Sequence, residues 1–166
     1  MTIRDILTLY DYNYWANHRI LATSAQVSAD QFVAPTANCF GTLRGTLVHT
    51  LGGELAWRML YQQGTLAYFG ALDEADFPTV DTLSTRWQTE EQAMRAYLAE
   101  LTDADLVDYI RYTTAEGDHR ARLLWHCLFH VVNHGTQHRS EAAAILTGYG
   151  YSPGELDFTA FLNEQR

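Results

Sequence analysis

Lysine is missing from this sequence altogether, so all 11 basic residues are arginines. They are scattered along the chain, and 20 acidic residues give it a formal net charge of −9. A protein that binds nucleic acid or an anionic membrane through phosphate groups needs a basic surface. We therefore expect no nucleic-acid partner and no binding to an anionic membrane.

Cysteines and long apolar runs are also scarce. The two cysteines, Cys39 and Cys127, form neither a disulfide framework nor a CxxC metal motif, and we expect both to be reduced thiols. No apolar stretch approaches the ~20 residues that a membrane span needs. The first residues, MTIRDILTLYDYNYW, lack the basic and then apolar pattern of a signal peptide. These absences favour a cytoplasmic protein.

The remaining pattern is mainly helical. Apolar residues recur at three- and four-residue steps over residues 3–25, 41–63, 82–101 and 122–148. Residues 105–114 and the turn signal at 115–118 predict a short β-hairpin. Asp157 is a suitable N-cap for a last helix over residues 158–163.

The length of 166 residues, without a repeat or linker, predicts one domain, 1–166. We expect an all-α, up-down four-helix bundle with a short C-terminal helix and a small hairpin before the fourth long helix. The long connections leave room for crossovers, so the pattern determines the fold class better than the topology.

The fourth long segment carries a histidine at each of four successive helical turns: His126, His130, His134 and His138. A four-residue step turns an α-helix by about 400°, so neighbouring histidines stack on one face and the stripe drifts slowly around the helix. Two imidazoles one turn apart can reach one metal ion. Because a buried neutral histidine brings a polar atom that must be satisfied, such a stripe favours a metal site. The spacing permits the pairs 126/130, 130/134 and 134/138 equally.

A third ligand can come from the second long segment, where His49 lies at the margin of the apolar stripe. A bundle can bring His49 opposite the histidine stripe, although a lone histidine is more often an ordinary core or surface residue. Three protein ligands leave positions open for water or substrate, as in catalytic zinc sites. Imidazole suits Zn, Ni, Cu and Fe(II), so the ligand type does not identify the metal.

Two neighbours of His49 are also informative. The pair Gly52-Gly53 costs about 1 kcal/mol of helix propensity per residue relative to alanine, and such a pair often marks close packing against a neighbour or ligand. Glu54 follows His49 by five residues, which places it about 140° around the helix. We therefore predict a surface position for Glu54 rather than a role as ligand or base.

Residues 130–139, HVVNHGTQHR, resemble the HVxNHxxxHR signature of the DinB-like family of metal-dependent bacterial proteins. The resemblance extends through most of the chain. It includes Tyr14-Trp15-Ala16-Asn17, then Leu47-Val48-His49 followed by Glu54 and Trp57, and finally Ser152-Pro153 and Leu156-Asp157-Phe158.

The resemblance implies a four-helix bundle in which a divalent metal ion, Zn or Ni, is bound by His49, His134 and His138. His130 would then lie beside the ligands, and the candidates to line a pocket are Asn17, Tyr14 and Trp57. Many members continue with Gly-Gln after the arginine, whereas this chain has Ser140-Glu141. That difference from the family does not affect the three predicted metal ligands.

Family members with known activities include thiol-dependent S-transferases and a maleylpyruvate isomerase that uses a low-molecular-weight thiol. The resemblance therefore implies an S-transferase, or a related hydrolase or isomerase, that acts on a small-molecule substrate with such a thiol. Because the sequence indicates no nucleophile or strong general acid of its own, the catalytic residues are open. The alternative is a non-catalytic metal-binding or ligand-sensing bundle. The resemblance and the many aromatic residues also suggest a homodimer.

Overall fold

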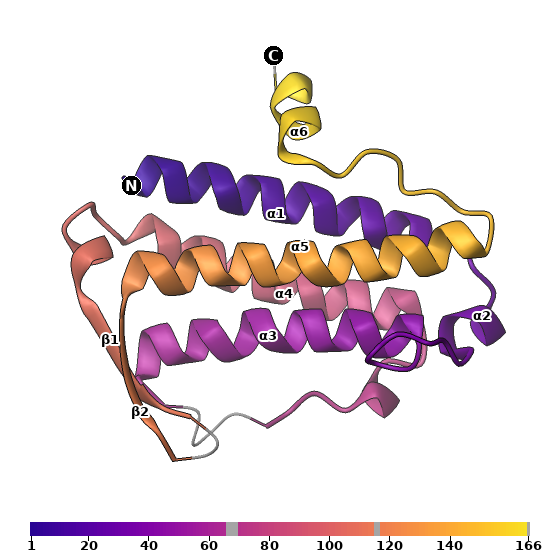
Figure 1. The fold of residues 1–166 in the computed structure, drawn as a ribbon, viewed down its shortest axis with the longest axis horizontal. Helices are drawn as coiled ribbons and strands as arrows, with labels where there is room; N and C mark the ends of the chain where they lie inside the picture. Colours follow the sequence, from indigo (N-terminus) through magenta and orange to yellow (C-terminus); the bar gives the residue numbers. More distant parts are fainter. Residues whose placement is uncertain (66–69, 115–116, 166) are drawn as a thin grey trace.

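Four long α-helices form the body of the computed structural model, which describes residues 1–65, 70–114 and 117–165 (Figure 1). These helices are α1 (Ile3–Ser24), α3 (Leu43–Gln63), α4 (Val80–Ala99) and α5 (Leu124–Gly148). The shorter elements among them are α2 (Ala29–Val33), the 3-10 turns η1 (Glu74–Asp76) and η2 (Asp105–Val107), and the C-terminal α6 (Phe158–Glu164). The predicted helical bundle with a short last helix is confirmed.

The four long helices run in two directions. Helices α3 and α4 run in the same direction, opposite to α1 and α5 (Figure 1). The order of directions is therefore up, down, down, up. Helix α5 lies between α1 and α3 and is the element that both neighbours pack against (Figure 1).

The predicted hairpin is also present. Strands β1 (Tyr109–Thr113) and β2 (His119–Leu123) are antiparallel, and their register places Tyr109 opposite Leu123. The predicted turn falls partly on residues 115–116, which lie outside the described residues. The hairpin extends from one end of the bundle, and β2 leads directly into α5 (Figure 1).

Local sequence signals explain where the helices begin. The side chain of Thr2 accepts a hydrogen bond from the Asp5 amide, and Asp5 accepts one from the Thr2 amide, which is a capping box. The Thr42 side chain caps α3 by accepting a hydrogen bond from the Gly45 amide. Asp157 caps α6 by accepting a hydrogen bond from the Ala160 amide at 3.0 Å, as predicted.

The core consists of two clusters of apolar side chains along the bundle. The inward residues of the long helices have almost no exposed surface, among them Ile6, Leu51, Leu83, Leu128 and Leu146. In the parts of the chain that the structure describes, no helix is long and apolar enough to cross a membrane.

Candidate metal centre

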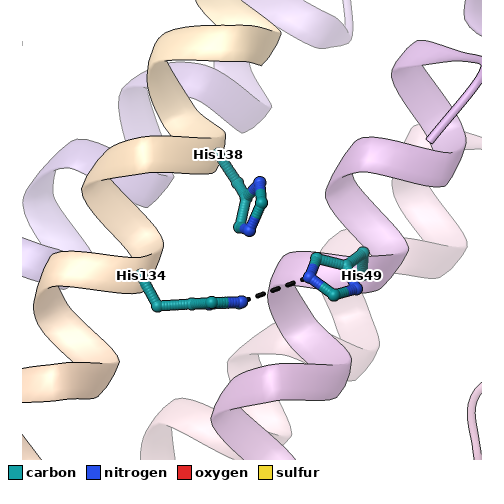
Figure 2. Close-up of side chains that lie close together, drawn as sticks. All are labelled: His49, His134 and His138. Carbon is teal, nitrogen blue, oxygen red and sulfur yellow. Dashed lines mark hydrogen bonds between the residues drawn. The ribbon is translucent and has the colours of Figure 1, made fainter. Parts of the chain in front are cut away.

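Three histidines from two neighbouring helices bring their rings together between α3 and α5 (Figure 2). His49 comes from α3, and His134 and His138 lie one turn apart on α5. The Nε2 atoms of His49 and His134 are 3.1 Å apart. The nitrogen atoms that the three residues can offer all lie within 4.8 Å of one another. The structure thus brings together the three histidines that the family resemblance selects, and we call them the triad.

The spacing and chemistry of the triad fit one divalent metal ion. Zinc binds imidazole nitrogen at about 2.0–2.1 Å, so two nitrogens on one tetrahedral ion lie about 3.3 Å apart. The 3.1 Å separation between His49 and His134 is close to that value. Three imidazoles would leave at least one coordination position open, as in zinc sites that carry out chemistry.

Two imidazoles of the triad, those of His134 and His49, are kept uncharged by their surroundings. Burial lowers the pKa of His134 to about 4, and the neighbouring His138, His49 and His130 act in the same direction. Burial also lowers the pKa of His49, with a further contribution from His138. His134 and His49 are therefore neutral at pH 7 and can offer lone pairs without first losing a proton.

Gly53 makes the room in which the His134 ring lies. A β-carbon added at residue 53 would stand 2.7 Å from Cε1 and 3.1 Å from Nδ1 of His134. Such contacts are too short for packed atoms, so the ring would have to move. One residue of the Gly52-Gly53 pair thus marks close packing against a candidate ligand. At Gly52 an added β-carbon would meet no atom within 4 Å.

We expect the Gly53→Ala variant to bind zinc at least about 10-fold more weakly than the wild type, the lower end of the loss seen when ligand orientation is disturbed. The added methyl group displaces the His134 ring, while the higher helix propensity of alanine favours the fold by about 1 kcal/mol. Gly52→Ala is the matched control and should retain wild-type affinity. Competition with a chromophoric chelator measures both variants, and equal affinities for the two would contradict the steric argument.

An aromatic ring covers one side of the triad. Phe40 stacks on His49 with ring centroids 3.8 Å apart and planes inclined by 17°, and it meets His138 edge-on at 5.1 Å. Its loop can approach α3 because residue 45 is glycine, at which a β-carbon would stand 2.2 Å from the Phe40 carbonyl oxygen. No motif in the sequence marks Phe40 as a site residue, and its position just before the start of α3 is the one signal that could have indicated it.

A groove of about 390 Å³ opens beside His49. Small or apolar residues make up most of its lining, including Gly45, Gly52, Ala56 and Leu72. Glu74 adds a carboxylate at its edge and is paired with Arg44 at 3.3 Å. The groove gives a small molecule access to the triad at His49.

His130 and Trp57 lie on the other flank of the triad, toward the hairpin. The His130 ring is 5.9 Å from that of His134 and 5.0 Å from that of Trp57. Partial burial of the ring lowers the pKa of His130. His126 is exposed and packs edge-on against Trp125 at 4.0 Å. His126, the histidine of the stripe nearest the hairpin, is therefore not part of the triad.

Asn17 and Tyr14, two candidates to line a pocket, are buried in α1 within the bundle core. The Arg95 guanidinium lies over the Tyr14 ring, 4.7 Å from its centroid. Asn17 donates a hydrogen bond to Glu54 at 2.9 Å. Both side chains thus have partners in the packing of the bundle.

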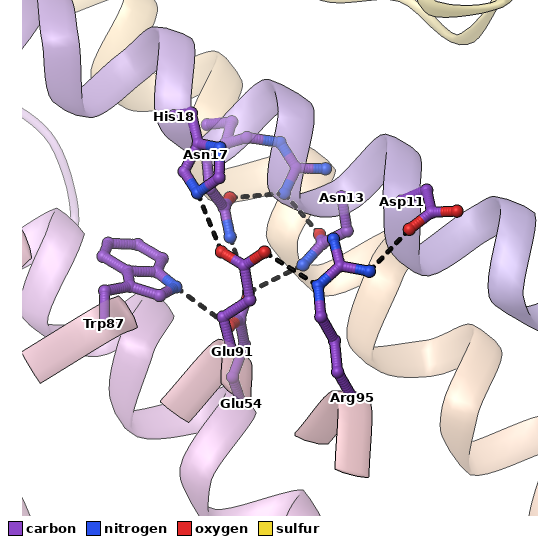
Figure 3. A network of polar contacts seen from close by, with 9 residues as sticks. Asp11, Asn13, Asn17, His18, Glu54, Trp87, Glu91 and Arg95 are labelled. Carbon is purple, nitrogen blue, oxygen red and sulfur yellow. Dashed lines mark hydrogen bonds and ion pairs between the residues drawn. The ribbon is translucent and has the colours of Figure 1, made fainter. Parts of the chain in front are cut away.

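Glu54 is buried, with 6% of its surface exposed, so the predicted surface position is wrong. Its Oε1 accepts hydrogen bonds from Asn13 at 2.8 Å and Asn17 at 2.9 Å, and its Oε2 accepts one from Trp87 at 2.9 Å (Figure 3). The 140° between His49 and Glu54 does turn the carboxylate away from the triad. That direction, however, points into the bundle, where the carboxylate meets side chains of α1 and α4 rather than solvent.

The carboxylate of Glu54 is linked to a buried cation through two amides. Arg139 Nη1 donates to the Oδ1 atoms of Asn13 at 2.5 Å and Asn17 at 2.8 Å. Burial raises the pKa of Glu54, whereas its hydrogen bonds and the charge of Arg139 lower it. We call Asn13, Asn17, Glu54, Trp87 and Arg139 the core network. It joins all four long helices, and Arg139 directly follows the candidate ligand His138 on α5.

Comparisons with known proteins agree with this architecture. The model of the DinB family matches residues 2–166. Protein DinB of Bacillus subtilis (strain 168) is 25% identical over 170 residues, which cover 93% of this chain and 91% of that protein. The crystal structure of a DinB-like protein from Bacillus cereus ATCC 10987 has a TM-score of 0.71 at 18% identity, covering 93% of this chain and 97% of that one. This second similarity bears on the fold alone.

Proposed function

Because the chain belongs to the DinB family, we propose that it is a metal-dependent enzyme that uses a low-molecular-weight thiol, either an S-transferase or a related hydrolase or isomerase. His49, His134 and His138 would bind the metal ion, Zn or Ni. The observation that carries the proposal is the cluster of three nitrogen ligands beside a groove of about 390 Å³. A purely structural metal site would need neither an open position nor a groove.

A divalent ion in such a site lowers the pKa of bound water or thiol, which makes a nucleophile available at neutral pH. The protein would contribute three oriented imidazoles, a Phe40 ring that keeps water from one side, and a largely apolar groove for the second substrate. In S-transfer the thiol sulfur forms a bond to an electrophilic carbon. The leaving group departs with its bonding electrons, and the thiol proton passes to solvent.

The protein's own thiols favour an external thiol as the nucleophile. Cys127 is buried, and burial raises its pKa to about 11, so it is protonated at neutral pH. A protonated buried thiol is a poor nucleophile. Cys39 is exposed in the loop before Phe40.

We further propose a small-molecule substrate and a cytoplasmic location, with no nucleic-acid or membrane partner. The net charge of −9 supports this, because polyanions would be repelled. The homodimer stays a prediction.

The test is an assay of thiol conjugation with zinc- or nickel-loaded, untagged protein. A chromogenic electrophile such as 1-chloro-2,4-dinitrobenzene is offered with cysteine, glutathione and other bacterial thiols in turn. We expect conjugation above the uncatalysed rate with at least one thiol. The rate should fall to background in His134→Ala and persist in His126→Ala, an exposed histidine on the same helix.

If the protein binds metal but every thiol reacts at the rate of the His134→Ala variant, the transferase proposal fails. That result would favour the alternative, a metal-binding or ligand-sensing bundle. If the protein binds no metal, both functions fail together.

A further inference from the structure

The His138 side chain has a carboxylate partner that the proposed metal site does not account for. His138 Nδ1 is 2.9 Å from Oε2 of Glu141, three residues further along α5. The His138 side chain is almost fully buried, with 6% of its surface exposed, and that of Glu141 is 25% exposed. The contact therefore lies at the inner margin of the helix rather than in free solvent.

This contact determines which nitrogen of His138 carries the proton. An ionised carboxylate can only accept hydrogen bonds, so the His138 Nδ1–H must donate to Glu141. In a neutral imidazole the other nitrogen, Nε2, then carries the lone pair. Nε2 is the remaining ring nitrogen that His138 can offer to a metal ion alongside His49 and His134.

The charge of Glu141 also acts on the triad beyond His138. Its Oε2 lies 2.9 Å from Nδ1 of His138, and the His138 ring centroid is 4.6 Å from that of His49. A negative charge at this position favours a cation between the three rings. Hydrogen bonding of a carboxylate to a ligand imidazole also makes the imidazole a stronger donor.

We infer that Glu141 is a positioning residue of the metal site, which holds His138 with Nε2 free for the metal ion and adds a negative charge that strengthens cation binding. The inference rests on the proposed metal site. Without such a site, the pair is an ordinary helix contact between residues three apart, which stabilises a helix only slightly. A contact of that kind would leave metal affinity unchanged.

Two substitutions separate the hydrogen bond from the charge. Glu141→Gln keeps a side-chain oxygen that can accept from Nδ1–H but removes the charge, and Glu141→Ala removes both. Glu100→Ala is the control, because it removes one exposed carboxylate at the C-terminal cap of α4. We expect zinc affinity to fall about 10- to 100-fold in Glu141→Ala, by a smaller factor in Glu141→Gln, and not at all in Glu100→Ala.

Nitrogen-15 NMR of the metal-free protein provides a second measurement that a merely structural contact would not move. We expect wild-type His138 to be protonated at Nδ1 and the Glu141→Ala variant to show a mixture of the two tautomers. The inference is overturned if wild-type His138 is protonated at Nε2, or if Glu141→Ala binds zinc within threefold of the wild type. A wild type that binds no zinc would instead overturn the proposed function itself.

Discussion

Replacing Glu54 with alanine should lower the free energy of unfolding by about 3–5 kcal/mol, the range found when one partner of a buried charge pair is removed. The substitution leaves the buried Arg139 guanidinium without the carboxylate to which Asn13 and Asn17 link it. It also removes the acceptor for Asn13, Asn17 and Trp87, and a buried donor without an acceptor costs about 1–3 kcal/mol. Urea denaturation followed by circular dichroism measures the change.

Two further variants make the Glu54 result specific. Glu54→Gln keeps an oxygen for the two asparagine amides and should cost less than alanine. Glu100→Ala removes an exposed carboxylate and should change stability by less than about 0.5 kcal/mol. A loss below about 1 kcal/mol in Glu54→Ala would show that the core network does not stabilise the bundle as its geometry implies.

The His134→Ala variant should lose stoichiometric zinc binding at micromolar concentrations. The His134 ring lies close to both other rings of the triad, with Nε2 3.1 Å from that of His49 and its ring centroid 4.4 Å from that of His138. Its removal takes away a direct ligand, so the loss should exceed the 10- to 100-fold that outer partners of a ligand contribute. Isothermal titration of the metal-free protein with zinc measures the effect.

The matched control is His126→Ala, on the same helix but outside the triad. It should retain the stoichiometry and affinity of the wild type. If His126→Ala weakens zinc binding as much as His134→Ala does, the metal binds elsewhere along the histidine stripe. Loss of fold in His134→Ala is checked by circular dichroism before titration.

Much of the fold could be predicted because local signals dominate in helices. The apolar period locates α1, α3, α4 and α5 to within a few residues, and Thr2 and Asp157 cap helices as their residue types predict. The direction of α4 could not be predicted in this way. Amphipathic periodicity contains no information about helix direction, which depends on how the helices pack together.

The candidate site could be predicted from the sequence only in part, because local patterns do not contain the packing of one helix against another. Spacing along α5 restricts the ligands to neighbouring pairs, but the choice of His134 and His138 depends on the height at which His49 meets α5. Only the packing of α3 against α5 determines which turn of α5 lies opposite His49. In the sequence, Gly53 was the one local indication of this packing. Glu54 was misplaced because helix angles locate a residue relative to His49 and not relative to the other helices. Its partners come from α1 and α4, which its local sequence does not reveal.

X-ray absorption at the zinc edge of untagged protein, loaded with one equivalent of zinc, tests the metal centre most directly. The predicted result is a first shell of nitrogen and oxygen at about 2.0–2.1 Å with the outer scattering of three imidazoles. That scattering should be diminished or absent in His134→Ala. A shell with sulfur at about 2.3 Å, or one without imidazole, would contradict a site formed by His49, His134 and His138.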